Sequence, residues 1–433
     1  MGVLCSCCCC ATDNDSDDAF LETLSIESTE AELAFKEKNY DGFLHALTEK
    51  TDDFENTYIV CKEYSKFLDE TFSSTFITRV EWLEMLIDKL GVELRTDISE
   101  SYSHVYDKNY FYGSEYFVTA IENGMLYLGW MEFDHYTPAT KQFVATSLTK
   151  SLDYDIDGFV LNCTDYEDID AKYEAAATVY LDYFELDENG CFNPDDMVTQ
   201  QQVDYLMSEL DIYNKLSGKS ILSFGDSIMY GTGNNAVGLS DLIAKRYKMQ
   251  VTDFAVSGAT FGKARGRVQI SNQILSAIER DLSADFILLN GGTNDMRWVN
   301  PGKMSDDFEY EEHGRNLFAN GMEYALGLIK DNFKDSKLVY VRAHDMEFSL
   351  ERNELHFAKI ALDICEKWEV DLVDIFRSTD FDAHDEEIRS KYTYHIPSHR
   401  NGDSVHPNRE GYYEFYVPLT VEKMLSLCDA KEN

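Results

Sequence analysis

The chain has 433 residues, with 80 Asp and Glu against 38 Lys and Arg, and a formal net charge of −42. This length exceeds what one ordinary hydrophobic core requires, so two domains are the default expectation. Such acidity disfavours nucleic acid and anionic lipid as partners, because both bind through clustered cations. No run approaches the roughly 20 apolar residues of a membrane span, which disfavours a transmembrane segment.

The first 25 residues combine a cysteine cluster with an acidic run. Cys5 and the cysteines at 7–10 are too dense for a tetrahedral zinc site, because adjacent residues cannot all converge on one metal. The sequence MGVLCS at 1–6 matches the N-myristoylation pattern, with cysteines nearby for palmitoylation. The basic start and apolar core of a secretory signal are not found here. We expect residues 1–25 to be a disordered leader.

Residues 26–215 contain a pattern that recurs about every 60 residues. Thr78, Thr140 and Thr199 each precede an amphipathic stretch, and they lie 62 and 59 residues apart. A threonine in this place is a favourable N-cap, because its hydroxyl accepts an N–H of the first helical turn. Further helical segments are predicted at 116–124 and 171–181. The sequence therefore predicts a mainly α-helical domain of three repeats.

Two of these repeats carry recognisable sequences, ITRVE at 77–81 and DENG at 187–190. They resemble S-layer homology repeats, modules that hold proteins on bacterial cell walls. The resemblance implies that Arg79 contacts an anionic wall glycan, whereas Lys141 and Gln200 take the equivalent positions in the other repeats. The alternative is a degenerate helical domain that only packs against the rest of the chain. The repeats imply a cell-surface or extracellular location, and the absence of a signal in residues 1–25 leaves a cytoplasmic location open.

The charge density changes near residue 215. Residues 1–215 hold 45 acidic and 13 basic residues, whereas residues 216–433 hold 35 and 25. We therefore expect a second domain at 216–433, where apolar runs predict strands starting near 220, 250, 285, 337 and 369. These strands, with helices between them, predict a three-layer α/β/α, flavodoxin-like domain with a mostly parallel five-stranded sheet.

Polar residues follow several of these strands. Ser227 comes directly after the strand at 221–224, where its hydroxyl would lie at the carboxyl edge of the sheet, the ligand-binding edge of open α/β folds. The next predicted strand, at 251–258, ends at Gly258, and Asn294 follows the third strand; both residues can supply donors to an oxyanion. Near the C-terminus, Asp403 precedes His406 by three residues, a spacing that lets the carboxylate accept from the imidazole Nδ1–H and leaves Nε2 to activate a serine.

These motifs, in this order, resemble the SGNH/GDSL hydrolase superfamily over residues 216–425. The resemblance implies a catalytic triad of Ser227, Asp403 and His406. It also implies an oxyanion hole made by the N–H groups of Ser227 and Gly258 and by the Asn294 amide. Asp295 is expected to brace the loop that presents Asn294. No metal and no organic cofactor is required. His344, after the strand at 338–341, is a further candidate to line the cleft.

The expected function is that of a serine esterase working through an acyl-enzyme. The substrate implied by a wall-binding module is a small acyl or acetyl group on a carbohydrate, with a cell-wall polymer as a further partner. The aromatic residues Trp298, Phe308 and Tyr310 either form a sugar-stacking rim or simply pack. The alternatives are a lipase, lysophospholipase or thioesterase of the same fold, or a non-catalytic cell-surface binding protein.

Overall fold

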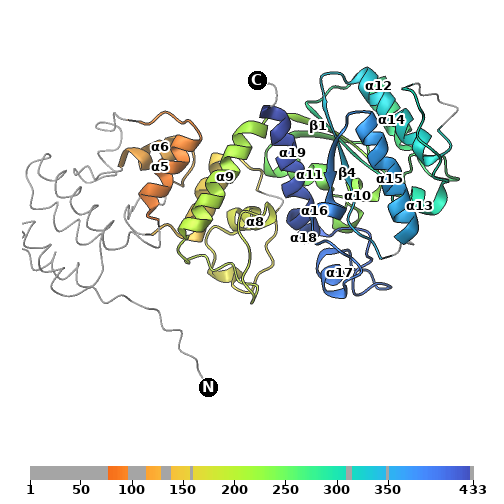
Figure 1. Cartoon of the computed structure of the whole chain (residues 1–433). Helices are drawn as coiled ribbons and strands as arrows, with labels where there is room; N and C mark the ends of the chain where they lie inside the picture. Colours follow the sequence, from red (N-terminus) through yellow and green to blue (C-terminus); the bar gives the residue numbers. More distant parts are fainter. Residues whose placement is uncertain are drawn as a thin grey trace, which may run out of the picture. The chain divides into compact units, whose positions relative to one another are not determined.

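The computed structural model describes residues 77–95, 114–127, 138–156, 159–308, 315–347 and 351–429. The predicted leader with its cysteine cluster, and the repeat domain up to residue 76, lie outside these residues. The chain divides into two compact units between Asp211 and Ile212, within helix α9 (Gln200–Leu216) (Figure 1). Among the described helices, none has the length and apolar character that crossing a membrane requires.

The second unit is built on a five-stranded sheet with the strand order β2-β1-β3-β4-β5. Every neighbouring pair of strands runs parallel, and each strand starts within two residues of the predicted position. The predicted five-stranded α/β domain is therefore confirmed. The strands are β1 (Ser220–Phe224), β2 (Gln250–Asp253), β3 (Phe286–Asn290), β4 (Lys337–Arg342) and β5 (Asp371–Asp374).

Helices cover both faces of this sheet, which explains why its central strands β1, β3 and β4 are mostly apolar. Leu222 and Phe224 of β1 pack in one core with α12 (Ile270–Glu279), α14 (Phe318–Asn332) and α15 (Glu351–Lys367). Ile221 faces the opposite core, with α11 (Leu239–Arg246) and α19 (Val417–Asp429). Figure 1 shows the sheet between these two helical layers.

Shorter helices follow the strands at their carboxyl ends. Two of them begin directly after β1 and β3, where the predicted site residues lie. The short helices are α10 (Ser227–Tyr230), η3 (Thr232–Asn234), α13 (Asp295–Trp298), α16 (Ile375–Ser378), α17 (Glu386–Tyr392), α18 (Arg409–Gly411) and the π-helical η5 (Tyr412–Tyr416).

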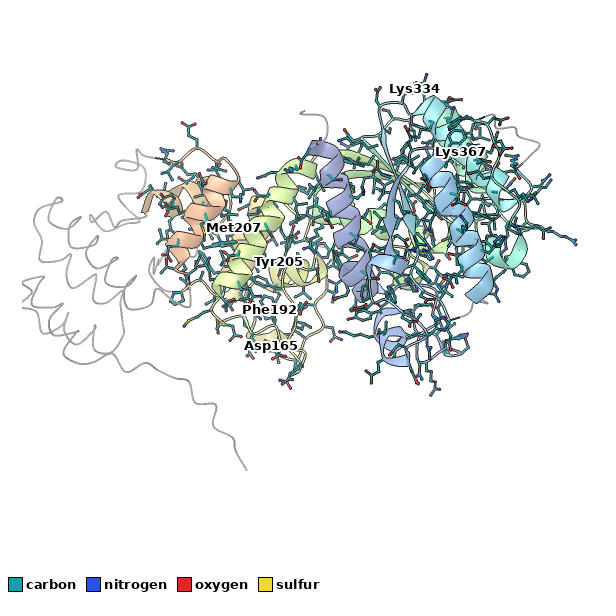
Figure 2. All side chains as sticks on the ribbon, in the orientation of Figure 1. Asp165, Phe192, Tyr205, Met207, Lys334 and Lys367 are labelled. Atoms are coloured by element: carbon teal, nitrogen blue, oxygen red, sulfur yellow. The ribbon has the colours of Figure 1, made fainter. Side chains whose placement is uncertain are left out.

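A buried ion pair ties an irregular segment to the helical layer of α14 and α15. Lys367 of α15, labelled in Figure 2, lies 2.5 Å from Glu323 of α14, and both side chains are almost fully buried. The Lys367 ammonium also donates to the carbonyl of Ser305 at 3.0 Å. The buried Lys367 charge is therefore compensated by Glu323. Its hydrogen bond to Ser305 also fixes the segment that follows α13.

In the first unit, the described helices begin where the repeat pattern predicts. Thr78 caps α5 (Arg79–Lys89) in a reciprocal box with Glu81, and Thr140 caps α7 (Lys141–Ser151). The Thr199 hydroxyl accepts the Gln202 N–H of α9 at 3.3 Å. The N-cap prediction is confirmed for all three threonines. The other helices of this unit are α6 (Ser114–Glu122), η2 (Tyr166–Asp168) and α8 (Lys172–Tyr180).

The three capping segments also pair with one another. The residues that precede the capping threonines are hydrogen-bonded to one another through their backbones. Ala139 N–H donates to Ile77 O at 2.7 Å, and Val198 N–H donates to Ala139 O at 2.9 Å. A further tie is Asp165, whose carboxylate accepts the Phe192 N–H at 2.8 Å, and Figure 2 shows the two residues close together. Repetition of one contact between successive segments supports a genuine structural repeat.

The last turn of α9 contributes to the core of the second unit. Leu216 is fully buried there, and Ile212 and Tyr213 pack against the same core. A fragment from Ile212 to the C-terminus should therefore fold cooperatively and be more stable than one that starts at Lys219. Burial of a leucine side chain contributes about 1.5–3 kcal/mol. Urea unfolding of the two fragments measures this difference, and equal midpoints would contradict the assignment.

Candidate active site

Ser227 lies at the start of α10, directly after the end of β1, and is almost fully buried. The chain reaches it through Gly225, where a Cβ atom would stand 2.9 Å from both Asn290 O and Met229 Cβ. Only glycine fits such a close approach. The amide of Gln273, on α12, bonds to both backbone groups of Gly225, each at 2.9 Å. The position of Ser227 is therefore fixed from both sides.

His406 links Ser227 to Asp403. Its Nδ1 lies 2.6 Å from Asp403 Oδ2, and its Nε2 lies 2.9 Å from Ser227 Oγ. A carboxylate can only accept, so Nδ1 carries the proton, and Nε2 of the neutral ring accepts from the serine hydroxyl. The structure thus brings the three predicted triad residues together across 179 positions of sequence.

The turn from Asp403 to His406 is held by the carboxylate and by a buried histidine. Asp403 Oδ1 accepts the N–H groups of Val405 and His406 at 3.0 and 2.9 Å. Burial by itself would raise the pKa of Asp403, but the hydrogen bond and charge of His406 and these N–H bonds outweigh it and lower the pKa. Ser404 takes a positive φ of 63°, a conformation that needs support from its surroundings.

His344 supplies that support. Its Nε2 lies 3.2 Å from the Ser404 carbonyl, which can only accept, so Nε2 donates and Nδ1 accepts from the Tyr416 hydroxyl at 2.7 Å. The ring also stacks on Phe381 with centroids 3.9 Å apart. His344 is fully buried, and burial lowers its pKa from 6.5 to about 3. It therefore stays neutral and supports the loop that carries Asp403 and His406.

The predicted oxyanion donors lie on the loops that follow β2 and β3. Strand β2 ends earlier than predicted, at Asp253, and the loop after it contains Gly258 with φ 84°. The Asn294 amide donates to Ala259 O at 3.1 Å and approaches Asp226 Oδ2 at 3.5 Å. Within the described residues, the N–H groups of Ser227 and Gly258 make no hydrogen bond. The N–H groups of Ser227 and Gly258 are thus available as donors, and the Asn294 amide lies on the neighbouring loop.

Two fully buried aspartates connect these loops. Asp295, predicted to brace the Asn294 loop, accepts the N–H groups of Phe261 and Gly262 at 3.0 and 2.8 Å, which ties the loop after β3 to the loop after β2. Asp226 caps α10 by accepting the Ile228 N–H at 3.0 Å. Burial raises the pKa of Asp226 to about 6 and that of Asp295 to about 7. The supporting role of Asp226 was missed, although it immediately precedes Ser227 in the sequence.

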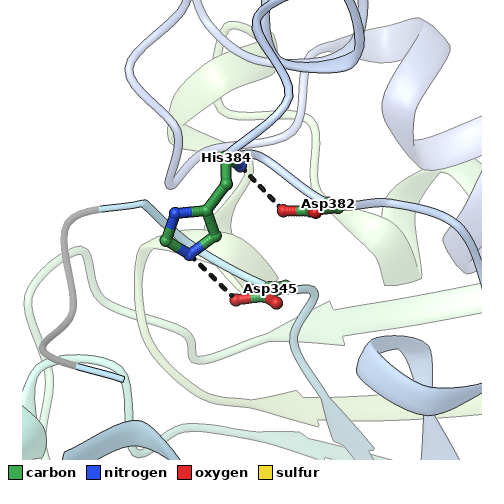
Figure 3. Close-up of side chains that lie close together, drawn as sticks. All are labelled: Asp345, Asp382 and His384. Carbon is green, nitrogen blue, oxygen red and sulfur yellow. Dashed lines mark hydrogen bonds and ion pairs between the residues drawn. The ribbon is translucent and has the colours of Figure 1, made fainter.

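A separate group of possible metal ligands, also missed at the sequence level, lies after β4. Figure 3 shows Asp345, Asp382 and His384 with their ligand atoms within 4.8 Å of one another. His384 Nε2 is 3.4 Å from Asp345 Oδ1, and the His384 N–H donates to Asp382 Oδ1 at 2.8 Å. These contacts link the three residues to one another, and Asp382 and His384 are exposed. Among the described residues, no other cluster of this kind is found.

The remaining predicted residues are placed as follows. The Arg79 guanidinium lies 5.2 Å from the centroid of the Phe143 ring, and the Lys141 ammonium donates to Phe192 O at 3.1 Å. Glycan binding by Arg79 stays a prediction. Trp298 and Phe308 are more than half exposed, while Tyr310 lies outside the described residues.

Residues 223–413 match the model of the GDSL-like Lipase/Acylhydrolase family. The chain therefore carries a GDSL-like ester hydrolase domain. The expected α/β fold of GDSL/SGNH type is confirmed by this match together with the parallel sheet. The match says nothing of the repeats, so their likeness to S-layer homology modules stays a prediction.

Several solved structures are similar to the hydrolase domain. They include a protein from Lactobacillus plantarum (19% identity, TM-score 0.39, covering 50% of this chain and 98% of that one). A member of the lipolytic G-D-S-L family from Veillonella parvula shows 18% identity and a TM-score of 0.33 over 48% of this chain and 96% of that one. Phospholipase A1 from Streptomyces albidoflavus shows 13% identity and a TM-score of 0.36 over 48% of this chain and 100% of that one. No curated protein matches the chain.

The buried His344 makes a prediction about acid stability. The unfolded chain protonates this residue below about pH 6.5, but the folded protein keeps it neutral down to about pH 3. The contribution of His344 to the free energy of unfolding is therefore complete above pH 6.5. It is lost as the pH falls towards 3, by about 1.4 kcal/mol per pH unit. In His344→Phe, which can retain the stack on Phe381, the free energy of unfolding should fall less steeply between pH 7 and pH 5 than in the wild type.

Urea unfolding at pH 7, 6 and 5 measures both slopes. The matched control is His356→Gln, because His356 is exposed on α15 and should leave the wild-type slope unchanged. Parallel slopes for the wild type and His344→Phe would show that His344 titrates normally in the folded protein.

Proposed function

We propose that the hydrolase domain is a serine esterase that works through a covalent acyl-enzyme, with Ser227 as nucleophile. The observation that supports this most directly is the unbroken series of hydrogen bonds from Ser227 through His406 to Asp403, at 2.9 and 2.6 Å. A serine hydroxyl is a weak nucleophile until a base removes its proton, and this arrangement provides such a base.

In the proposed first step, Ser227 Oγ attacks the ester carbonyl while His406 Nε2 accepts its proton. Asp403 keeps the proton of Nδ1 in place and stabilises the imidazolium, and its lowered pKa keeps it ionised at neutral pH. His406 then gives the proton to the departing alcohol. Water then attacks the acyl carbonyl as it loses a proton to the same nitrogen, and His406 returns this proton to Ser227 Oγ as the acid departs.

The negative charge on the carbonyl oxygen would be stabilised by the N–H groups of Ser227 and Gly258 and by the Asn294 amide. The Asn294 contact with Asp226, at 3.5 Å, is at the limit of a hydrogen bond, so an oxyanion can compete for this hydrogen. Loss of one oxyanion donor typically lowers kcat by about 10²–10³. The N–H groups of Phe261 and Gly262 donate to the Asp295 carboxylate, which ties together the two loops that carry Gly258 and Asn294.

The proposed acyl group is short. A cavity of about 40 Å³ is lined by Thr293, Met296, Phe318 and Phe357, and Thr293 precedes Asn294 in the chain and bonds to Asp226. We place the acyl group in this cavity, whose size suits an acetyl group better than a long acyl chain. This supports small acyl esters, such as acetylated carbohydrates, over long-chain lipids as substrates.

Ser227→Ala should lower kcat for p-nitrophenyl acetate by about 10⁴-fold or more, because the activated nucleophile is removed. Its thermal midpoint should change little, since one hydroxyl contributes about 1 kcal/mol. Reaction with a fluorophosphonate probe should also be lost. The matched control is Ser257→Ala, an exposed serine on the loop after β2, which should keep both activity and labelling. Activity above a tenth of the wild-type rate in Ser227→Ala would exclude Ser227 as nucleophile.

A series of p-nitrophenyl esters from acetate to palmitate tests the size of the acyl group. The value of kcat/KM should be highest for acetate and should fall as the chain lengthens beyond what the cavity holds. Met296→Ala enlarges the cavity and should raise the butyrate-to-acetate ratio of kcat/KM by severalfold. A wild-type preference for palmitate would instead indicate a lipase.

A further inference from the structure

One stretch of the hydrolase domain lacks acidic residues, although the chain as a whole is strongly acidic. From residue 254 to residue 278 there is no Asp or Glu, although 80 of the 433 residues are acidic. The same 25 residues contain Lys263, Arg265 and Arg267. This stretch includes Gly258 and leads from β2 into α12, so its cations lie on the loop beside the proposed oxyanion hole.

Two of these cations line an open cavity of about 620 Å³ in which donor groups predominate. The described polar residues around it are three cations and three amides, with no carboxylate among them. They are Lys263, Arg267, Arg315, Gln269, Asn272 and Asn316.

Hydrogen bonds hold the walls of this cavity in place. The Lys263 N–H donates to Asn316 O at 3.2 Å, and the buried Gln269 amide donates to Arg315 O at 3.0 Å. Residues 263–269 are thereby fixed to the segment that precedes α14. The cavity is thus formed by two segments some 50 positions apart in sequence.

Arg267 connects the cavity to the reaction centre. Its Nη1 donates to Gly258 O at 2.9 Å, and its guanidinium lies 4.9 Å from the ring centroid of the exposed Trp298. These contacts hold the side chain in one orientation, so little conformational freedom remains to be lost when a ligand binds. Within the described residues, neither Lys263 nor Arg267 forms an ion pair.

We propose that this cavity, formed by residues 263–272 and 315–316, binds an anionic group on the alcohol part of the ester substrate. The group is a carboxylate or a phosphate, because guanidinium and ammonium groups together with amide donors match the acceptor oxygens of either. The strongly negative remainder of the chain repels free anions, so the cationic cavity provides a local and specific attraction. This inference rests on the proposed esterase function.

The kinetic test uses two acetyl esters that differ in one charge, 4-acetoxybenzoate and its neutral methyl ester, with 4-acetoxyphenyl phosphate as the phosphate arm. Lys263→Gln should lower the ratio of kcat/KM for the anionic over the neutral ester by about tenfold at low salt, and added salt should lower the wild-type ratio. The matched control is Arg265→Gln, because Arg265 is exposed on the same loop but does not line the cavity, and its ratio should stay at the wild-type value.

An equal ratio in wild type and Lys263→Gln, or an equal fall in Arg265→Gln, would overturn the proposal. Comparison of the carboxylate and phosphate esters identifies which anion the cavity prefers.

A binding measurement on the full chain separates this proposal from the esterase function itself. By ligand-observed NMR, 4-hydroxybenzoate or 4-hydroxyphenyl phosphate should bind several times more tightly than neutral 4-hydroxybenzamide, and Lys263→Gln should remove the difference. Hydrolysis of the neutral ester without selective anion binding would overturn the anion site alone. Selective binding without hydrolysis of any ester would overturn the esterase function and leave the anion site standing.

Discussion

Strand β1 pairs in parallel with β2 on one side and with β3 on the other, and the active site depends on this arrangement. In this register Ser223 lies opposite Asp253, the last residue of β2, and Phe224 lies opposite Leu289, next to the end of β3. The three carboxyl ends therefore meet at one edge, with the Ser227 loop between the loops of Gly258 and Asn294. A shift of one strand by a residue would turn its apolar side chains to the opposite face and displace its loop.

Buried polar groups hold the loops at this edge, in addition to the apolar packing of residues such as Ile228 and Phe261. Gln273 holds Gly225, Asp295 holds Phe261 and Gly262, and His344 holds Ser404. Each of these side chains forms the hydrogen bond that a backbone group would otherwise make with water. The loops can therefore be buried and still be held in one conformation. This matters for acyl transfer because the donors must be in place before charge develops on the substrate oxygen.

The same burial gives the site opposing responses to pH. Asp226 and Asp295 have pKa values raised by burial above the unfolded value of 3.8, so their stability contribution is complete below about pH 4 and is lost as the pH rises towards 6 and 7. His344 responds in the opposite direction, since its pKa is lowered. Between these groups, Asp403 stays ionised because His406 compensates for its burial.

The sequence by itself determined the local features of this protein. The predicted starts of all five strands lie within two residues of the observed ones, Thr78, Thr140 and Thr199 marked helix starts, and the residues after several strands identified the candidate site. These features are readable because strand burial and helix capping depend on neighbours a few positions away.

Only the tertiary structure decided which distant groups meet. Several contacts join positions that no local sequence pattern relates. They are the hydrogen bonds between Gln273 and Gly225, the hydrogen bond from His344 to Ser404, and the walls of the cavity between residues 263–272 and 315–316. Such contacts follow from strand order and from how helices pack on the sheet. These are collective outcomes of burying the whole core, so they leave no signature in the spacing of individual residues.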